Sequence, residues 1–178
     1  KDTSKKVRAI KKMQAERGER LGGKPPYGYK KRDAQSKKIV PDEETAPVVR
    51  RIFDLCAGGK GPNQIARILT EEQMLNPTNQ YYQATGATCT NLDTTRPCVW
   101  CGKTVADILE NKVYIGHTLA MRTTTLSYKN KKTIQNPESE QILVENTHEP
   151  LISQETWEIV QDVRKHKRRA PKLMDEPN

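Results

Sequence analysis

Residues 45–73 read TAPVVRRIFDLCAGGKGPNQIARILTEEQ, and apolar residues recur in this stretch at steps of three and four. That period is typical of helices with one buried face. Gly58 and Gly59 end the first pattern, and Gly61-Pro62 suits the start of a second. The stretch therefore predicts two core helices, at 45–57 and 62–73, joined by a short turn. The residues expected to face the core are Val48, Val49, Ile52, Phe53, Cys56, Ile65, Ile68 and Leu69.

Beyond residue 100, the pattern predicts a short helix followed by a β-hairpin. Thr104 suits the N-cap of the helix. Its inward face is expected to hold Val105, Ile108 and Leu109. Apolar and polar residues then alternate over 114–122, as in a half-buried strand. A polar tip at 127–137 and a returning strand at 141–145 would complete the hairpin.

The last predicted helix begins after Ser153, which suits its N-cap. Ile152, just outside the helix, and Trp157, at its fourth position, form the pair expected of a hydrophobic staple. Together these elements predict an α+β fold that is mainly α. Its core would resemble a helix-turn-helix or winged helix carrying a β-hairpin.

Residues 76–99 are polar and have no helical or strand period, so they are predicted to form a long loop that interrupts the helix-turn-helix. At the end of this loop, Cys98 and Cys101 have the two-residue spacing that lets two thiolates bind one zinc ion. Cys89 and His117 are the further candidate ligands. Because no second pair at matching spacing exists, zinc remains an alternative, as does a disulfide, and no cofactor is expected.

The N-terminal segment carries the positive charge of the chain. Residues 1–38 contain 14 Lys/Arg and 4 Asp/Glu, whereas residues 39–178 contain 17 and 18, for a net charge of +9. Residues 3–17 are predicted to form a helix with a narrow apolar ridge, and the Gly/Pro-rich segment after it is predicted to be an extended strap. A basic segment of this kind favours binding to nucleic acid, although a solvated charged face has the same composition.

Several other classes of function find no support in the sequence. No apolar run approaches the roughly 18 residues of a membrane span. The three histidines are scattered without a nucleophile and base beside them, and no phosphate-binding Gly-Lys-Ser/Thr loop is present. The chain begins at Lys1 without an initiator Met, so it is expected to be part of a longer protein.

Five segments in one order resemble the recombinase domain of large serine recombinases, particularly the transposases of mobilisable elements. The segments are GGKPPYGY (22–29), VVRRIF (48–53), GPNQIARIL (61–69), Trp100 with KTVADILENKVYIG (103–116), and HEPLISQETWEIVQ (148–161). The resemblance spans residues 3–168.

The resemblance implies a division of labour in which the catalytic serine lies in a domain that precedes this chain, so no catalytic residue is expected here. Residues 1–21 would end a long linker helix, and the strap, 22–42, would follow the minor groove of DNA. Residues 43–163 would form the DNA-binding domain in the adjacent major groove, and 164–178 a basic helix end and tail. The full protein would act in the bacterial cytoplasm, at the nucleoid, as a homodimer on each site and a tetramer at synapsis.

Because residues 39–163 hold 11 basic and 16 acidic residues, most of the affinity for double-stranded DNA is expected in the N-terminal segment. The short helix predicted after residue 103 and the hairpin would add further contacts to DNA. The expected DNA-binding residues are Lys5, Lys6, Arg8, Lys11, Lys12, Arg17, Arg20, Lys24, Tyr27, Tyr29, Lys103, Asn111, Lys112, Arg122, Lys129, Lys131 and Lys132. Two alternatives stay open: a free-standing winged-helix regulator, and a module that binds RNA or an acidic protein.

Overall fold

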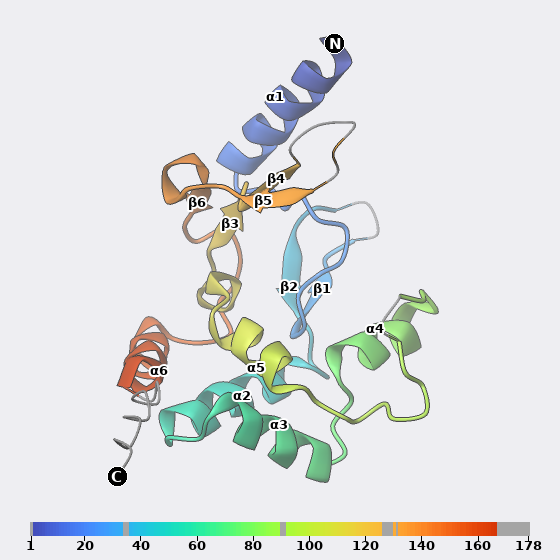
Figure 1. Cartoon of the computed structure of the whole chain (residues 1–178), viewed down its shortest axis with the longest axis vertical. Helices are drawn as coiled ribbons and strands as arrows, with labels where there is room; N and C mark the ends of the chain where they lie inside the picture. The colour runs from blue at the N-terminus through green and yellow to red at the C-terminus, as the bar shows by residue number, and fades with distance from the viewer. Residues whose placement is uncertain (1, 34–35, 90–91, 126–129, 131, 167–178) are drawn as a thin grey trace, which may run out of the picture. The chain divides into compact units, whose positions relative to one another are not determined.

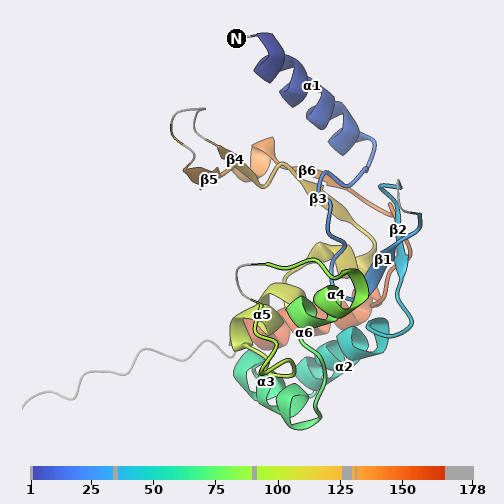
Figure 2. The same cartoon turned by 90° about the vertical axis from the view of Figure 1, so that its right-hand side faces the viewer.

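The computed structural model describes residues 2–33, 36–89, 92–125, 130 and 132–166, with residues 2–5 described by their backbone alone. Helices and short antiparallel β-ladders share this part of the chain, so the fold is α+β (Figure 1, Figure 2). The helices are α1 (Asp2–Glu16), α2 (Ala46–Ala57), α3 (Pro62–Glu71), α4 (Pro77–Thr85), α5 (Gly102–Leu109) and α6 (Gln154–His166), with 3-10 turns η1 (Lys112–Ile115) and η2 (Glu138–Glu140).

The chain divides into two compact units. The first comprises residues 1–51 and 110–154, and the second comprises residues 52–109 and 155–178, as far as these are described. The predicted faces of the core helices are confirmed. In α2, Val48, Val49, Ile52, Phe53 and Cys56 are buried, and in α5 Val105, Ile108 and Leu109 are buried.

The strands of the first unit pair in antiparallel ladders. β1 (Tyr29–Lys31) pairs with β2 (Ile39–Pro41), β3 (Thr118–Ala120) with β6 (Ile142–Val144), and β4 (Thr123–Thr125) with β5 (Thr133–Gln135). The last two ladders follow each other along the same two chain segments and confirm a hairpin with a strand at 142–144. The predicted tip at 127–137 is wrong in part, because residues 133–135 form β5 and pair with β4. The β1–β2 ladder, in contrast, lies in the segment predicted to be a strap without strands.

A buried aromatic cluster fixes the strap within the first unit. The ring of Tyr29 stacks on Tyr114 with centroids 6.1 Å apart, and its centroid lies 5.1 Å from that of His148 in an edge-on contact. The Tyr29 hydroxyl donates to the carbonyl of Glu149 at 2.8 Å, and the Tyr114 hydroxyl donates to the carbonyl of Tyr27 at 2.9 Å. These bonds satisfy both buried hydroxyls while tying the strap to distant parts of the sequence.

Gly28 shows why the strap needs glycine. Its φ is +91°, a conformation that L side chains rarely adopt, and a Cβ there would lie 2.7 Å from Val49 Cγ2 and 2.9 Å from Leu151 Cδ1. The backbone therefore passes close to α2 at the residue before β1. Any side chain at position 28 would push the strap away from this contact.

The C-terminal end of α1 is also held by the first unit. Ala15 is fully buried, and α1 contacts β6. The helix ends before Gly18, which has a φ of +71° and packs so closely on Thr147 that a Cβ would lie 2.6 Å from its methyl group. The preceding turns of α1 extend away from β6, as Figure 2 shows.

In the second unit, α3 and α5 pack against each other. Gly102 allows this approach, since a Cβ at its position would lie 1.8 Å from Asn63 Oδ1 and 3.3 Å from Asn63 Cα. The indole of Trp100 donates to the carbonyl of Met74 at 2.9 Å, and the rings of Phe53 and Trp157 lie 5.8 Å apart. Large aromatic residues therefore contribute to the core of this small unit, as the sequence predicts.

Three local predictions are wrong. Residues 77–85 form α4 instead of continuing a loop, because Asn76 caps the amides of Thr78 and Asn79 and Gly86 ends the helix at a φ of +69°. Residues 114 and 115, predicted to start the strand at 114–122, instead belong to η1, because Asn111 caps this turn too. The third predicted helix begins at Gly102, so Thr104 lies inside α5 and is not its N-cap.

Candidate nucleic-acid interface

The predicted DNA-binding residues of α1 are exposed. Lys6, Arg8, Lys11 and Lys12 point to solvent, and among the described residues none of the four forms an ion pair. Arg8 and Lys12 are four residues apart, so they share one face of the helix. Lys5 lies on the same turn, but its side chain is outside the described residues. α1 therefore presents cationic groups that acidic residues of the described chain do not occupy.

The apolar ridge of α1 is exposed as well. The exposed fractions of Val7, Ile10 and Met13 are 45%, 53% and 51%. These residues are three apart and share a face, as predicted. The prediction that this helix is the end of a longer one stays a prediction.

Beyond α1, the cations are held closer to the fold. Arg17 and Lys24 are exposed, whereas Arg20 is half-buried and its guanidinium donates to the carbonyl of Lys24 at 2.8 Å. Burial lowers the pKa of Arg20 from its ordinary value, because a low-polarity surrounding disfavours the charged form. No acidic side chain among the described residues pairs with it.

The two tyrosines of the strap, which were both predicted to contact DNA, differ from each other in burial. Tyr29 has an exposed fraction of 4%, and both its ring and its hydroxyl are engaged in the core, so its predicted contact with DNA gains no support from the structure. Tyr27 is half-buried. Burial raises the pKa of both phenols, which keeps the hydroxyls protonated. Tyr29 acts as an anchor of the strap, whereas Tyr27 keeps part of its surface accessible.

Two of the three predicted residues in the segment from α5 to η1 have local partners. The Lys103 ammonium forms an ion pair with Asp107 one turn along α5, and both side chains are exposed. Asn111 Oδ1 accepts from the amide of Val113 at 3.2 Å, so this side chain caps η1. Lys112 is exposed. Of these three, Lys112 is the side chain that forms no hydrogen bond or ion pair with a described residue. The capping role of Asn111 was not predicted.

The hairpin carries exposed cations next to the β4–β5 ladder. Arg122 precedes β4 and Lys132 precedes β5, and both are exposed. Lys129 and Lys131 lie outside the described residues. The structure therefore shows exposure for two of the four hairpin cations that were predicted to bind DNA.

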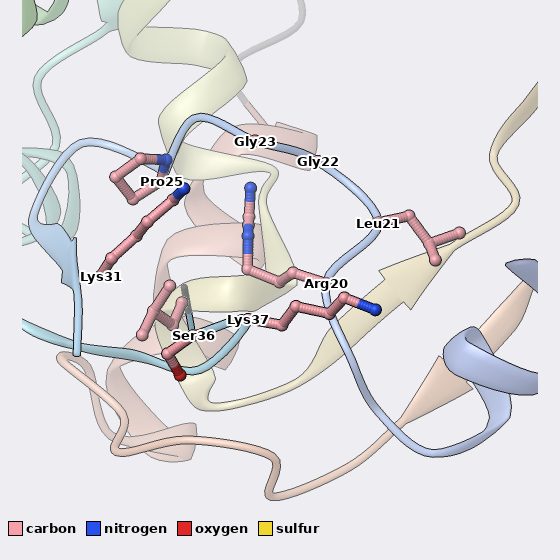
Figure 3. A pocket seen from close by; sticks show the side chains of 9 residues that line it. Arg20, Leu21, Gly22, Gly23, Pro25, Lys31, Ser36 and Lys37 are labelled. Atoms are coloured by element: carbon pink, nitrogen blue, oxygen red, sulfur yellow. The ribbon is translucent and has the colours of Figure 1, made fainter. Parts of the chain in front are cut away.

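A cationic pocket around Arg20 was missed by sequence reasoning. It has a volume of about 240 Å³ and is lined by residues of the strap and of the β1–β2 ladder (Figure 3). Among its lining residues are Arg20, Lys31, Ser36 and Lys37. The only sequence signal was the basic run itself, because no local pattern indicates that residues 20–25 line one pocket with Lys31 and Ile39 of the β1–β2 ladder.

The cysteines offer no metal site in the described chain. Cys56 is buried, Cys89 and Cys101 are exposed, and Cys98 Sγ lies 3.1 Å from the carbonyl of Gln73. All four are free thiols. Within the described ranges, no three His, Cys, Asp or Glu residues gather in a way that could hold a metal ion. The zinc alternative for Cys89, Cys98 and Cys101, with His117, therefore gains no support.

A model of the Recombinase family matches residues 43–167, which is more than half of the chain. The chain belongs to the Recombinase family. Residues 43–167 thus form a recombinase domain, and the basic helix and strap precede it. Among the described helices, none has the length and apolar character needed to cross a membrane.

Solved structures support the fold of the recombinase domain. One, from work on the sequence requirements of the Listeria innocua prophage attP site, is 21% identical with a TM-score of 0.54. Another is a crystal structure of an LSR–DNA complex, 20% identical with a TM-score of 0.53. Both alignments cover 96% of this chain, which spans only 56% and 42% of the two structures' lengths.

Proposed function

We propose that this chain is the DNA-recognition segment of a large serine recombinase or transposase. It binds part of one arm of an attachment site during site-specific integration or excision. The observation that carries the proposal is the set of exposed cations on α1, which pair with no acidic group among the described residues, in a chain whose residues 43–167 form a recombinase domain. Lys and Arg side chains that neutralise phosphates release condensed counterions, which supplies the sequence-independent part of DNA affinity.

Within this function, α1 and the strap contact the DNA backbone and minor groove. The domain of residues 43–163 then lies in the adjacent major groove. The packed pair α3 and α5 acts as a helix-turn-helix interrupted by α4, and the hairpin of β3 to β6 acts as the wing. Support for this arrangement comes from the close α3–α5 approach at Gly102 and from exposed Lys112, Arg122 and Lys132.

Catalysis belongs to a domain outside this chain, joined to it through α1. Serine recombination exchanges strands between two sites, so the full protein is expected to bind each site as a homodimer and to form a tetramer at synapsis. Its place of work would be the bacterial nucleoid. The family membership gives no support to the alternative of a free-standing winged-helix regulator.

A gel-shift comparison tests the class of ligand. The chain is titrated into labelled duplex DNA, single-stranded RNA of equal length, and duplex DNA with an acidic protein as competitor. The proposal predicts preference for the duplex and little effect of the acidic competitor. Preference for the single-stranded RNA would contradict it, because the proposed groove contacts require a double helix.

Selection from a randomised duplex library, followed by sequencing, tests the recognition step. Base contacts by the recombinase domain predict enrichment of one sequence family, whereas α1 alone would retain all sequences equally. Unchanged library composition after repeated selection would reduce the proposed role to non-specific DNA binding.

A further inference from the structure

The pocket around Arg20 combines positive charge with room for a small anionic group. We call it the Arg20 pocket and define it by Arg20, Gly22, Gly23, Lys31, Ser36 and Lys37. Its volume is about 240 Å³. A water molecule takes about 30 Å³ in the liquid, so the pocket has room for a phosphate group that keeps some of its waters.

Charge in the Arg20 pocket is only partly compensated. Lys37 Nζ lies 2.9 Å from Glu19 Oε2, so its charge is balanced. Arg20 and Lys31 form no ion pair with any described residue. Arg20 is half-buried, and burial of a charged group without an opposite charge is unfavourable. An anion in the pocket would offset this cost.

The side chains of Arg20 and Lys31 line the same pocket. Lys31 is the last residue of β1 and pairs in register with Ile39 of β2, whose side chain also lines the pocket. Figure 3 shows the side chains of Arg20 and Lys31 reaching toward the loop of Gly22, Gly23 and Pro25, whereas the Lys37 ammonium points elsewhere. A guanidinium offers two parallel donors to one phosphate, and an ammonium adds a point charge.

The glycine loop adds space beside these cations. A Cβ at Gly23 would meet nothing within 4 Å, and one at Gly22 would meet only the Arg20 guanidinium at 3.5 Å. Among the described residues, the amides of Gly22 and Gly23 donate to no other group, so both remain able to donate to an anion. Backbone amides of this kind commonly form part of anion-binding loops.

We infer that the Arg20 pocket binds one backbone phosphate of double-stranded DNA and so sets the register of the strap on the duplex. This inference rests on the proposed function. Lys31 and Ser36 thereby join the DNA-binding surface. Arg20 is a fixed phosphate ligand, in contrast to the freely rotating cations of α1, because its guanidinium is held by the carbonyl of Lys24.

Fluorescence anisotropy with a labelled duplex, measured over a series of NaCl concentrations, tests the inference. Arg20→Gln and Lys31→Gln are each expected to weaken binding about tenfold, as loss of a charge-assisted hydrogen bond does. Each should also reduce the magnitude of the salt slope by about 0.9. Arg20→Lys keeps the charge but loses the fork, so it should weaken binding while leaving the slope unchanged.

Lys60→Gln is the matched control, because Lys60 is an exposed turn lysine outside the pocket and outside the predicted DNA-binding set. It should bind within about twofold of the wild type, as expected for an exposed, screened charge that has no proposed phosphate contact. The melting temperature of each variant is measured alongside. If Arg20→Gln unfolds the strap, the exposed Lys31→Gln still decides the outcome.

Three results would contradict the inference in different ways. Binding by Arg20→Gln and Lys31→Gln that equals that of Lys60→Gln would remove the pocket from the DNA interface and leave the proposed function intact. Displacement of the duplex by micromolar pyrophosphate, with loss of this effect in Lys31→Gln, would assign the pocket to a small free phosphate compound. Failure of the wild-type chain to bind any duplex would contradict the proposed function itself.

Discussion

α1 and α2 both place apolar residues at helical spacing among charged ones, yet the two helices differ in what becomes of those residues. Phe53 and Ile52 of α2 are fully buried, whereas Ile10 and Met13 of α1 are about half exposed. Helical periodicity therefore predicts the helix but not its burial, which depends on a partner surface. In this chain the buried helix supports the fold, and the exposed one is available to a ligand.

Truncating an apolar side chain should change the stability of the protein far more in α2 than in α1, and this is the largest effect that we expect. Phe53→Ala should lower the free energy of unfolding by about 3–5 kcal/mol, because it leaves a cavity beside Trp157. Met13→Ala, on the exposed ridge of α1, should change it by less than about 0.5 kcal/mol. Urea unfolding followed by circular dichroism measures both. Similar losses in the two variants would show that the α1 ridge is packed in solution.

Gly28 and Gly23 extend the comparison to the strap. Gly28→Ala should cost about 1–3 kcal/mol of stability, because a Cβ would overlap Val49 and Leu151 at a positive φ. Gly23→Ala meets nothing within 4 Å, so its stability should stay close to that of the wild type. Equal melting temperatures for the two variants would contradict the close approach of residue 28 to α2.

Tyr29 gives a smaller test of the same anchoring. Tyr29→Phe removes the buried hydroxyl that donates to Glu149, and should cost about 1–2 kcal/mol. Tyr82→Phe is the matched control, because no described group bonds the Tyr82 hydroxyl. If Tyr29→Phe retained full stability but bound DNA more weakly, the tyrosine would belong to the interface after all.

The smallest effect that we expect is a dependence of stability on pH that comes from His148. Burial lowers the pKa of His148 from its ordinary value of 6.5, and nearby Arg20 and His117 lower it further, while the bond to the Val113 carbonyl raises it. The unfolded chain therefore takes up this proton more readily than the folded one. The stability present above pH 6.5 should decrease as the pH falls below 6.5.

Substitution checks the origin of this dependence. His148→Gln should flatten the decrease between about pH 6.5 and 5, above the range in which most carboxylates titrate. The same pH dependence in His148→Gln and the wild type would show that another group is responsible.

Much of the fold could be predicted from the sequence, because local patterns set the core helices and the hairpin. α2, α3, α5 and α6 each carry an apolar face at helical spacing, and all four are present. α4 was missed because its residues are mainly polar, although Asn76 and Gly86 were available as start and stop signals. The η1 turn was missed because its apolar residues mimic the alternation of a strand.

The candidate site was less predictable than the fold. Charge alone identified the exposed lysines of α1, since solvated cations need no partner within the chain. The sequence could not show that Tyr27 and Tyr29, two residues apart, differ in burial. They differ because the ring of Tyr29 packs on Tyr114 and His148. The Arg20 pocket depends on β1–β2 pairing, so composition gave no indication of it.

The salt dependence of duplex binding tests most directly whether the exposed cations of α1 carry the affinity. If six phosphates are neutralised, the logarithm of the wild-type binding constant should fall against the logarithm of salt concentration with a slope of about −5. Replacing Lys6, Arg8, Lys11 and Lys12 together by Gln should reduce that slope to about −1.5 with the melting temperature unchanged. An unaltered slope in this variant would contradict the account.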